Sequence, residues 1–210
     1  MGQLAVLGSG SFARQAAEIA RLNGHEIVAC YSVSKGGFEP LYRGYLTHLE
    51  QDHGGFDGVV LGIAAVDRRS LAIRRGLIDW LVERGVACPP LVSPLAFCSE
   101  GVELASGVVL SHGAILGLDA EVGPFSICNS GSMIGHTVRI DANVIVAPGA
   151  FIGDDVTVGP NSLVGPLAKV LQGVTLAEDT LVGAGCLALR DLKVGQSLWP
   201  KPDWMNAQHR

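Results

Sequence analysis

Two histidines, His112 and His136, lie between residues 91 and 198 among small and aliphatic residues. An imidazole changes charge near neutral pH, so a histidine held beside a reacting group can take a proton from an amine or a hydroxyl. The two histidines are 24 residues apart. In the repeat described below, this spacing puts them on different faces, so they cannot share a metal ion within one chain. A catalytic zinc site of three histidines is therefore disfavoured, and we expect no metal.

The segment that begins at Gly8 has the residues of a phosphate-binding loop. Its glycines permit a tight turn after a strand, and the helix that follows offers free N–H groups to an anion. An NAD site would also need an acidic residue at the end of the second strand, where the chain has Tyr31 and Ser32. We therefore expect a nucleotide sugar here, unless the glycines only close the strand–helix turn. The candidate binding residues are Gly8, Ser9, Gly10, Ser11, Phe12 and Arg14.

Residues 1–90 have the pattern of a small α/β domain with a parallel sheet. Apolar runs predict strands at 3–7, 27–30 and 59–63, and amphipathic patterns predict one helix that follows residue 13 and continues to about 22, and a second from 67 to 84. Four residues fall on the apolar face of the second helix: Leu71, Leu77, Ile78 and Leu81. The pair Pro89 and Pro90 marks the end of this domain.

From Val92 to Leu187 the sequence repeats every six residues, sixteen times without an insertion. The first positions are all aliphatic or cysteine: Val92, Cys98, Leu104, Leu110, Leu116, Val122, Cys128, Ile134, Ile140, Val146, Ile152, Val158, Val164, Val170, Leu176 and Val182. The fifth positions are small or β-branched. This period is typical of a solenoid of short stacked strands, with three hexads to a coil and the first position pointing to the axis. We expect the solenoid at 91–198 and a tail at 199–210.

Composition restricts the class of protein further. The chain has 210 residues, 48% hydrophobic and 17% charged, with a net charge of -5, which disfavours a nucleic-acid surface. The sequence has no apolar run of the roughly 20 residues that a membrane span needs. The five cysteines have no CxxC spacing, and we expect them reduced, with Cys98, Cys128 and Cys186 at core or corner positions of the repeat. We therefore expect a cytoplasmic protein.

A glycine-loop domain followed by this solenoid resembles the hexapeptide-repeat sugar acetyltransferases, which include bacillosamine and perosamine N-acetyltransferases and sialic acid O-acetyltransferases. The most specific stretch is 128–136, with Asn129 and His136 at the spacing of that family, and residues 170–179 and 182–185 resemble its last coils. The resemblance covers nearly the whole chain. It implies a left-handed parallel β-helix and a homotrimer.

The resemblance also implies an activity and its residues. His136 would be the general base for transfer of an acetyl group from acetyl-CoA to a nucleotide-linked amino sugar, with Asn129 in the same catalytic group. A backbone N–H near Gly153 and Asp154 would stabilise the oxyanion. The residues implied for acetyl-CoA binding, between subunits, are Ile145, Gly153, Asp154, Gly165, Pro166, Gly183 and Ala184. The alternatives are O-acetylation of a sugar such as sialic acid, and a non-catalytic protein that binds nucleotide sugars.

The sequence departs from the family at several of these positions. The acidic residue that often follows the base is Thr137, a second histidine nine residues on is Ile145, and a glycine eighteen residues on is Asp154. Because one coil is eighteen residues, Asp154 stacks on His136. We therefore hypothesise that its carboxylate orients and supports the imidazole in place of the missing acidic neighbour. The alternative is an aspartate that only forms a turn.

Overall fold

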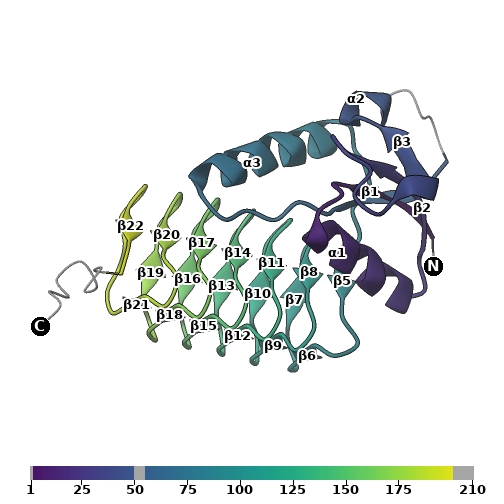
Figure 1. Cartoon of the computed structure of the whole chain (residues 1–210). Coiled ribbons are helices and arrows are strands. Elements are labelled where there is room, and N and C mark those ends of the chain that lie inside the picture. The colour runs from purple at the N-terminus through teal and green to yellow at the C-terminus, as the bar shows by residue number, and fades with distance from the viewer. Residues whose placement is uncertain (1, 50–54, 201–210) are drawn as a thin grey trace, which may run out of the picture.

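The computed structural model describes residues 2–49 and 55–200, which form a small α/β domain and a β-solenoid (Figure 1). The first domain has a parallel sheet in the order β3-β2-β1-β4. Its strands are β1 (Gln3–Leu7), β2 (Glu26–Tyr31), β3 (Tyr42–Gly44) and β4 (Gly58–Leu61). Its helices are α1 (Ser11–Leu22), the short helix η1 (Glu39–Leu41), α2 (Leu46–Leu49) and α3 (Arg68–Glu83).

The predicted strands and helices of this domain are confirmed to within one to three residues; the largest difference is at the start of α1, which begins at Ser11. Helix α3 begins where the Asp67 carboxylate accepts the backbone N–H of Ser70 at 2.7 Å, an N-terminal cap that satisfies a free donor. The elements between 39 and 49 were not predicted, because they are too short to show a period. On α3, Leu71, Ile78 and Leu81 are buried, whereas Leu77 is only partly buried and the fully buried Arg74 shares their face.

The solenoid is the predicted parallel β-helix, left-handed as the resemblance implies. Within the predicted repeat, strands pair at a spacing of eighteen residues, as in Ile134 with Ile152, which confirms three hexads to a coil. Three sheets form the faces of a prism. The first contains β5 (Leu91–Val92), β8 (Val109–Leu110), β11 (Ile127–Cys128), β14 (Ile145–Val146), β17 (Leu163–Val164), β20 (Leu181–Val182) and β22 (Ser197–Leu198). The last of these lies beyond the predicted repeat, which ends at Leu187.

The second sheet contains β6 (Phe97–Cys98), β9 (Ile115–Leu116), β12 (Met133–Ile134), β15 (Phe151–Ile152), β18 (Lys169–Val170) and β21 (Leu187–Ala188). The third contains β7 (Glu103–Leu104), β10 (Glu121–Val122), β13 (Arg139–Ile140), β16 (Thr157–Val158) and β19 (Thr175–Leu176). From Leu110 to Val182 the first positions fill the interior of the prism, as predicted, and all are nearly inaccessible to solvent. Cys98 is exposed, against the prediction, because it lies in the first coil at the open end of the prism.

The residue that precedes the first position of each hexad points outward from the prism. The chemical character of these outward residues differs between the three sheets. On the first sheet they are buried under the N-terminal domain: Leu91, Val109, Ile127, Ile145, Leu163 and Leu181. We call this sheet the covered face. On the second sheet they are mostly apolar and exposed, and we call it the open apolar face: Phe97, Ile115, Met133, Phe151, Lys169 and Leu187. The third sheet carries Glu103, Glu121, Arg139, Thr157 and Thr175 and is the polar face.

Helices α1 and α3 hold the domain on the covered face along its two edges (Figure 1). Helix α1 lies on the corner shared with the open apolar face, where Gln15 contacts Ser130 at 3.1 Å and Glu18 lies 3.5 Å from His112. We call this the α1 corner. Helix α3 lies on the corner shared with the polar face, the α3 corner, where Arg68 donates to the carbonyl of Asp179 at 2.6 Å. No helix among the described residues is long and apolar enough to span a membrane.

Candidate functional site

His136 lies on the third corner of the prism, between the open apolar face and the polar face, where the chain passes from β12 to β13. Its side chain is exposed. This His136 corner is opposite the covered face, so it is the corner farthest from the N-terminal domain of the same chain. One chain alone therefore does not bring its predicted base to its own predicted nucleotide-sugar loop.

The imidazole of His136 has a fixed hydrogen bond to the coil below it. Its Nδ1 accepts the backbone N–H of Leu118 at 2.9 Å. Because that nitrogen must have a free lone pair to accept, the neutral ring carries its proton on Nε2. In this arrangement Nε2 donates, and His136 can accept a proton only at Nδ1 once the Leu118 bond is released.

Asp154 stacks on His136 as predicted, but its carboxylate contacts the backbone rather than the ring. Its Oδ1 accepts the N–H of His136 at 2.9 Å. The N–H groups of Leu118 and His136, each at the third position of its hexad, donate to side chains and take no part in the ladder of backbone bonds. The imidazole of His136 accepts the N–H of Leu118, and the carboxylate of Asp154 accepts the N–H of His136, so both N–H groups are satisfied. The carboxylate of Asp154 thus holds the backbone of the corner and forms no hydrogen bond with the imidazole, so its support of the ring stays a hypothesis.

Thr137 carries local strain next to His136. Its φ is 54°, in the left-handed region that β-branched residues rarely adopt. Its hydroxyl donates to the carboxylate of Asp155 in the coil above, so Asp155 is a bonded corner residue rather than a free turn aspartate. Coil stacking therefore holds the His136 corner in one conformation.

Asn129 does not lie beside His136. It is on the α1 corner, and the width of the open apolar face separates it from the His136 corner. Its Oδ1 accepts the N–H of Ser130 at 2.8 Å, next to the contact between Ser130 and α1. The two residues are close in sequence, yet the structure places them on different corners.

The glycine loop forms the predicted turn between β1 and α1. Gly8 has φ 108°, and a Cβ there would lie 2.9 Å from the carbonyl oxygen of Gly62, so the loop needs glycine at this position. Gly10 caps α1 without a side-chain hydrogen bond, and the first turn has no acidic residue. The helix therefore leaves N–H groups available to an anion.

Hydroxyl groups surround the start of this loop where an NAD site would need a carboxylate. The Oγ of Ser9 lies 2.6 Å from that of Ser32 and 3.0 Å from that of Ser34. Hydroxyls donate hydrogen bonds to phosphate oxygens as well as accept them, and they do not repel an anion. The end of β2 is therefore compatible with a phosphate group.

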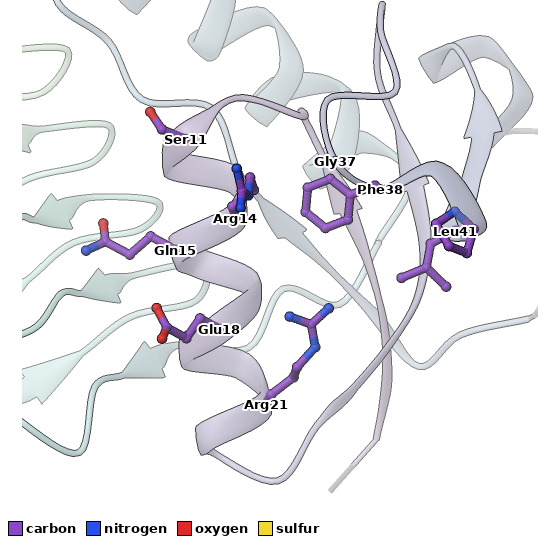
Figure 2. A pocket seen from close by; sticks show the side chains of 9 residues that line it. Ser11, Arg14, Gln15, Glu18, Arg21, Gly37, Phe38 and Leu41 are labelled. Carbon is purple, nitrogen blue, oxygen red and sulfur yellow. The ribbon is translucent and has the colours of Figure 1, made fainter.

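A pocket of about 750 Å³ opens beside the loop, between α1 and residues 37–41 (Figure 2). Arg14 and Arg21 point toward Phe38 and Leu41, whereas Gln15 and Glu18 point to the solenoid side of the helix. The full lining is Ser11, Arg14, Gln15, Glu18, Arg21, Gly37, Phe38, Pro40 and Leu41. Two arginines and an aromatic ring in one hollow can bind a phosphorylated ligand with a planar ring.

The sequence pattern indicated only some of the residues that line this pocket. Ser11 and Arg14 line it, but Phe12 packs against the apolar core instead. The sequence contained a signal for Arg21, because a residue seven positions after Arg14 lies on the same helix face. Phe38 and Leu41 come from a segment without a period, so no pattern identified them.

The residues predicted to bind acetyl-CoA fall in three places. Gly153 and Asp154 are on the His136 corner. Pro166 and Ala184 are exposed on the α1 corner, in coils beyond the reach of α1, with Gly165 and Gly183 buried beside them. Ile145 is 2% exposed and packs under the N-terminal domain, so in this chain it has no surface for a ligand. The described residues contain no group of three or more metal-binding side chains.

No family model and no curated protein matches the sequence, but solved structures match its full length. A histidine-to-alanine variant of GDP-perosamine N-acetyltransferase from Caulobacter crescentus, in complex with CoA and GDP-perosamine, is 26% identical. The match covers 96% of this chain and 95% of that chain, with a TM-score of 0.83.

Two further structures share the fold at lower identity. The acetyltransferase domain of PglB from Neisseria gonorrhoeae with acetyl coenzyme A is 22% identical, with 93% and 94% of the two chains covered and a TM-score of 0.82. WeeI from Acinetobacter baumannii is 19% identical, with 95% and 97% covered and a TM-score of 0.65. The hexad repeat, the glycine-loop domain on its covered face and these matches over the whole length confirm the resemblance of this chain to the hexapeptide-repeat acetyltransferases.

Proposed function

We propose that the protein transfers an acetyl group from acetyl-CoA to the amino group of a nucleotide-linked amino sugar. The observation that carries this proposal is the match, over both domains, to an acetyltransferase solved with CoA and GDP-perosamine. The pocket beside α1 supports it independently, because its arginines and the free helix N-terminus suit a sugar nucleotide.

The nucleotide sugar would bind in the N-terminal domain. We place its phosphates at the start of α1, against Ser9, Ser11 and Arg14, and the nucleoside in the pocket with Arg21 and Phe38. Glu18, the acidic residue of this helix segment, faces the solenoid and contacts His112 at 3.5 Å, so it does not repel the phosphates. The sugar would then extend from the start of α1 toward the open coils of the α1 corner.

The acetyl-transfer site would combine two copies of the chain in a homotrimer. Within one chain, the α1 corner and the His136 corner are the two edges of the open apolar face. This face exposes Phe97 (61%), Met133 (45%) and Ile115 (44%), an apolar column that favours contact with another protein surface. A copy packed there would bring its own corner, with its pocket, beside His136 of the first copy.

The same packing explains why the predicted coenzyme residues are divided between corners. Acetyl-CoA would lie in the channel between two copies, with Gly153 and Asp154 of one copy on one side. Pro166 and Ala184 of the other copy would form the opposite side. No metal takes part in this proposal.

In the reaction, the sugar amine forms a bond to the thioester carbonyl carbon, the C–S bond breaks, and the thiolate of CoA leaves. His136 would take the proton that the amine loses and return it to the thiolate sulfur. Because the Nδ1 of His136 accepts a hydrogen bond from the N–H of Leu118, substrate binding would have to break that bond before Nδ1 could take a proton. Asp154 would position the backbone of the corner, while its charge would oppose the developing oxyanion.

All five cysteines are free and four of them are buried, which is compatible with a reducing compartment. We therefore also propose a cytoplasmic location, which cell fractionation would test.

Acetyl-CoA consumption with a panel of nucleotide sugars tests the proposed activity. The panel pairs each nucleotide amino sugar with the analogue that has a hydroxyl in place of the amine, and with the free amino sugar. We expect turnover only with a nucleotide amino sugar. Turnover only with the hydroxyl sugars would show that the protein is an O-acetyltransferase instead. Tight binding without any turnover would indicate a binding protein.

A further inference from the structure

Among residues 2–49 and 55–200, one charged side chain lies wholly inside the protein. Arg74 of α3 is 0% exposed, and no carboxylate among the described residues pairs with it. Its Nε donates to the carbonyl of Ile63 at 2.7 Å and its Nη1 to the Oδ1 of Asn143 at 2.8 Å. Its Nη2 has no hydrogen-bond partner in the described part of the chain. Burial without a counter-charge is costly, and it lowers the pKa of Arg74 to about 9.

The two acceptors belong to different parts of the molecule. Ile63 follows β4, in the N-terminal domain, and Asn143 is on the α3 corner of the solenoid. Asn143 is 2% exposed, and its amide donates to Asn161 at 2.9 Å and to the carbonyl of Leu71 at 3.4 Å. Arg74 therefore bonds a segment of the first domain to the stacked corner of the second, through a buried contact to Asn143 and a partly buried one to Ile63.

The Ile63 segment also supports the glycine loop. A Cβ on Gly8 would lie 2.9 Å from both the carbonyl oxygen of Gly62 and the Cγ1 of Ile63, and a Cβ on Gly62 would lie 2.8 Å from the Cα of Ala13 in α1. The backbones at Gly8, Gly62 and the start of α1 are thus in direct contact. A shift of Ile63 relative to the solenoid would move the loop by a similar amount.

We infer that Arg74 is a positioning residue, which fixes the glycine loop at one distance from the solenoid so that a bound sugar meets the acetyl donor. This inference rests on the proposed function. A misplacement of about 1 Å between reacting groups can cost roughly a hundredfold in rate. A buried hydrogen-bonded cation specifies one geometry. The polar contacts of Gln15 and Arg68, which also join the two domains, are exposed or only partly buried.

The effect of Arg74 is tested by comparing binding with turnover. In Arg74→Met we expect kcat to fall by tenfold or more, while the KM for acetyl-CoA and the Kd for the nucleoside diphosphate alone, measured by calorimetry, change by less than about threefold. In Arg74→Lys we expect partial recovery of kcat. An unchanged kcat in a folded Arg74→Met protein would overturn the inference, and so would a Kd for the diphosphate that rises in proportion to the loss of kcat.

A second pair of variants keeps the test valid if Arg74→Met does not fold. Asn143 and Asn161 occupy the same column with φ 56° in both, so glycine fits either backbone. Asn143→Gly removes the acceptor of Arg74, and Asn161→Gly, the matched control, does not. We expect a loss of kcat only in Asn143→Gly, and equal losses in both would overturn the inference.

Hydrogen exchange separates this inference from the proposed activity, because it needs no substrate. We expect faster exchange across α3 in Arg74→Met and Asn143→Gly than in the wild type and Asn161→Gly, with the solenoid strands unchanged. This result in a protein that transfers no acetyl group would retain the role of Arg74 in fixing the domain and overturn the proposed function. Unchanged exchange across α3 would overturn the role of Arg74 itself.

Discussion

The covered face and the open apolar face are built from the same repeat, yet only one of them is covered by the chain itself. Ile145 on the covered face is 2% exposed, whereas Ile115 on the open apolar face is 44% exposed. Both are isoleucines at the outward position before the first residue of a hexad. The polar face, with Glu121 and Arg139 at that position, shows what this solenoid places in water. We therefore propose that the open apolar face is an interface between copies of the chain, and that its two edges meet in the acetyl-transfer site.

The largest effect should come from placing a charge on the open apolar face. Met133→Glu would put a carboxylate in the centre of the apolar column, and burying it against a second copy would be costly. We expect light scattering to give a monomer and acetyl transfer to be lost. Thr157→Glu on the polar face is the matched control and should keep both assembly and activity. A monomeric wild-type protein that transfers acetyl at full rate would contradict the comparison.

Replacement of His136 should slow turnover without affecting assembly. We expect His136→Ala to lower kcat by roughly two to four orders of magnitude, the range for a positioned general base, with acetyl-CoA binding intact. His136→Asn is the informative companion, because an amide oxygen at the position of Nδ1 can still accept the N–H of Leu118. Equal losses in both variants support the base role. Activity retained in His136→Asn alone would mean that the bond to Leu118 is what matters.

The same substitution should destabilise the single chain more on the covered face than on the open apolar face. Ile145→Ala leaves a cavity under α1 and α3 and should cost about 2–5 kcal/mol in free energy of unfolding. Ile115→Ala, on the open apolar face, should cost less than about 1 kcal/mol in the monomer. Denaturant unfolding of both variants in the Met133→Glu background checks this. Equal costs would show that the two faces are covered alike.

The smallest effect should come from Asp154. Asp154→Asn keeps an oxygen that can accept the N–H of His136 but removes the charge near the thioester oxygen, so we expect kcat to change by less than about tenfold. Asp154→Ala, which leaves that N–H without its acceptor, should be slower than Asp154→Asn. Steady-state kinetics of both variants checks this order. The reverse order would assign the carboxylate charge, rather than the hydrogen bond, to the function of Asp154.

The sequence predicted those parts of the molecule that repeat. Sixteen hexads determine which residues point to the axis, because each coil imposes the same packing on the next. The period could not show which outward face is covered, since Ile145 and Ile115 occupy equivalent positions and only the docking of α1 and α3 distinguishes them. The family resemblance grouped Asn129 with His136, although one strand of the open apolar face and a corner turn separate them.

The N-terminal domain was less predictable where its structure depends on tertiary contacts. Its glycine loop had a local pattern and was found, whereas Phe38 and Leu41 reach the pocket from an irregular segment. Arg74 follows Leu71 by three residues on the apolar face of α3, which is the signal that a buried charge leaves in a helical pattern. Its partner Asn143 is 69 residues away along the chain, so the network itself could not be predicted.

The central claim is that each site takes its pocket from one copy and His136 from another, and subunit mixing tests it most directly. His136→Ala is inactive but keeps its pocket, and a double variant with Arg14→Glu and Arg21→Glu is inactive but keeps His136. We predict that trimers assembled from an equal mixture of the two recover about a quarter of the wild-type activity, the fraction of sites that combine an intact pocket with an intact histidine. A mixture no more active than the sum of its parents, with mixed trimers shown by mass spectrometry, would contradict the account.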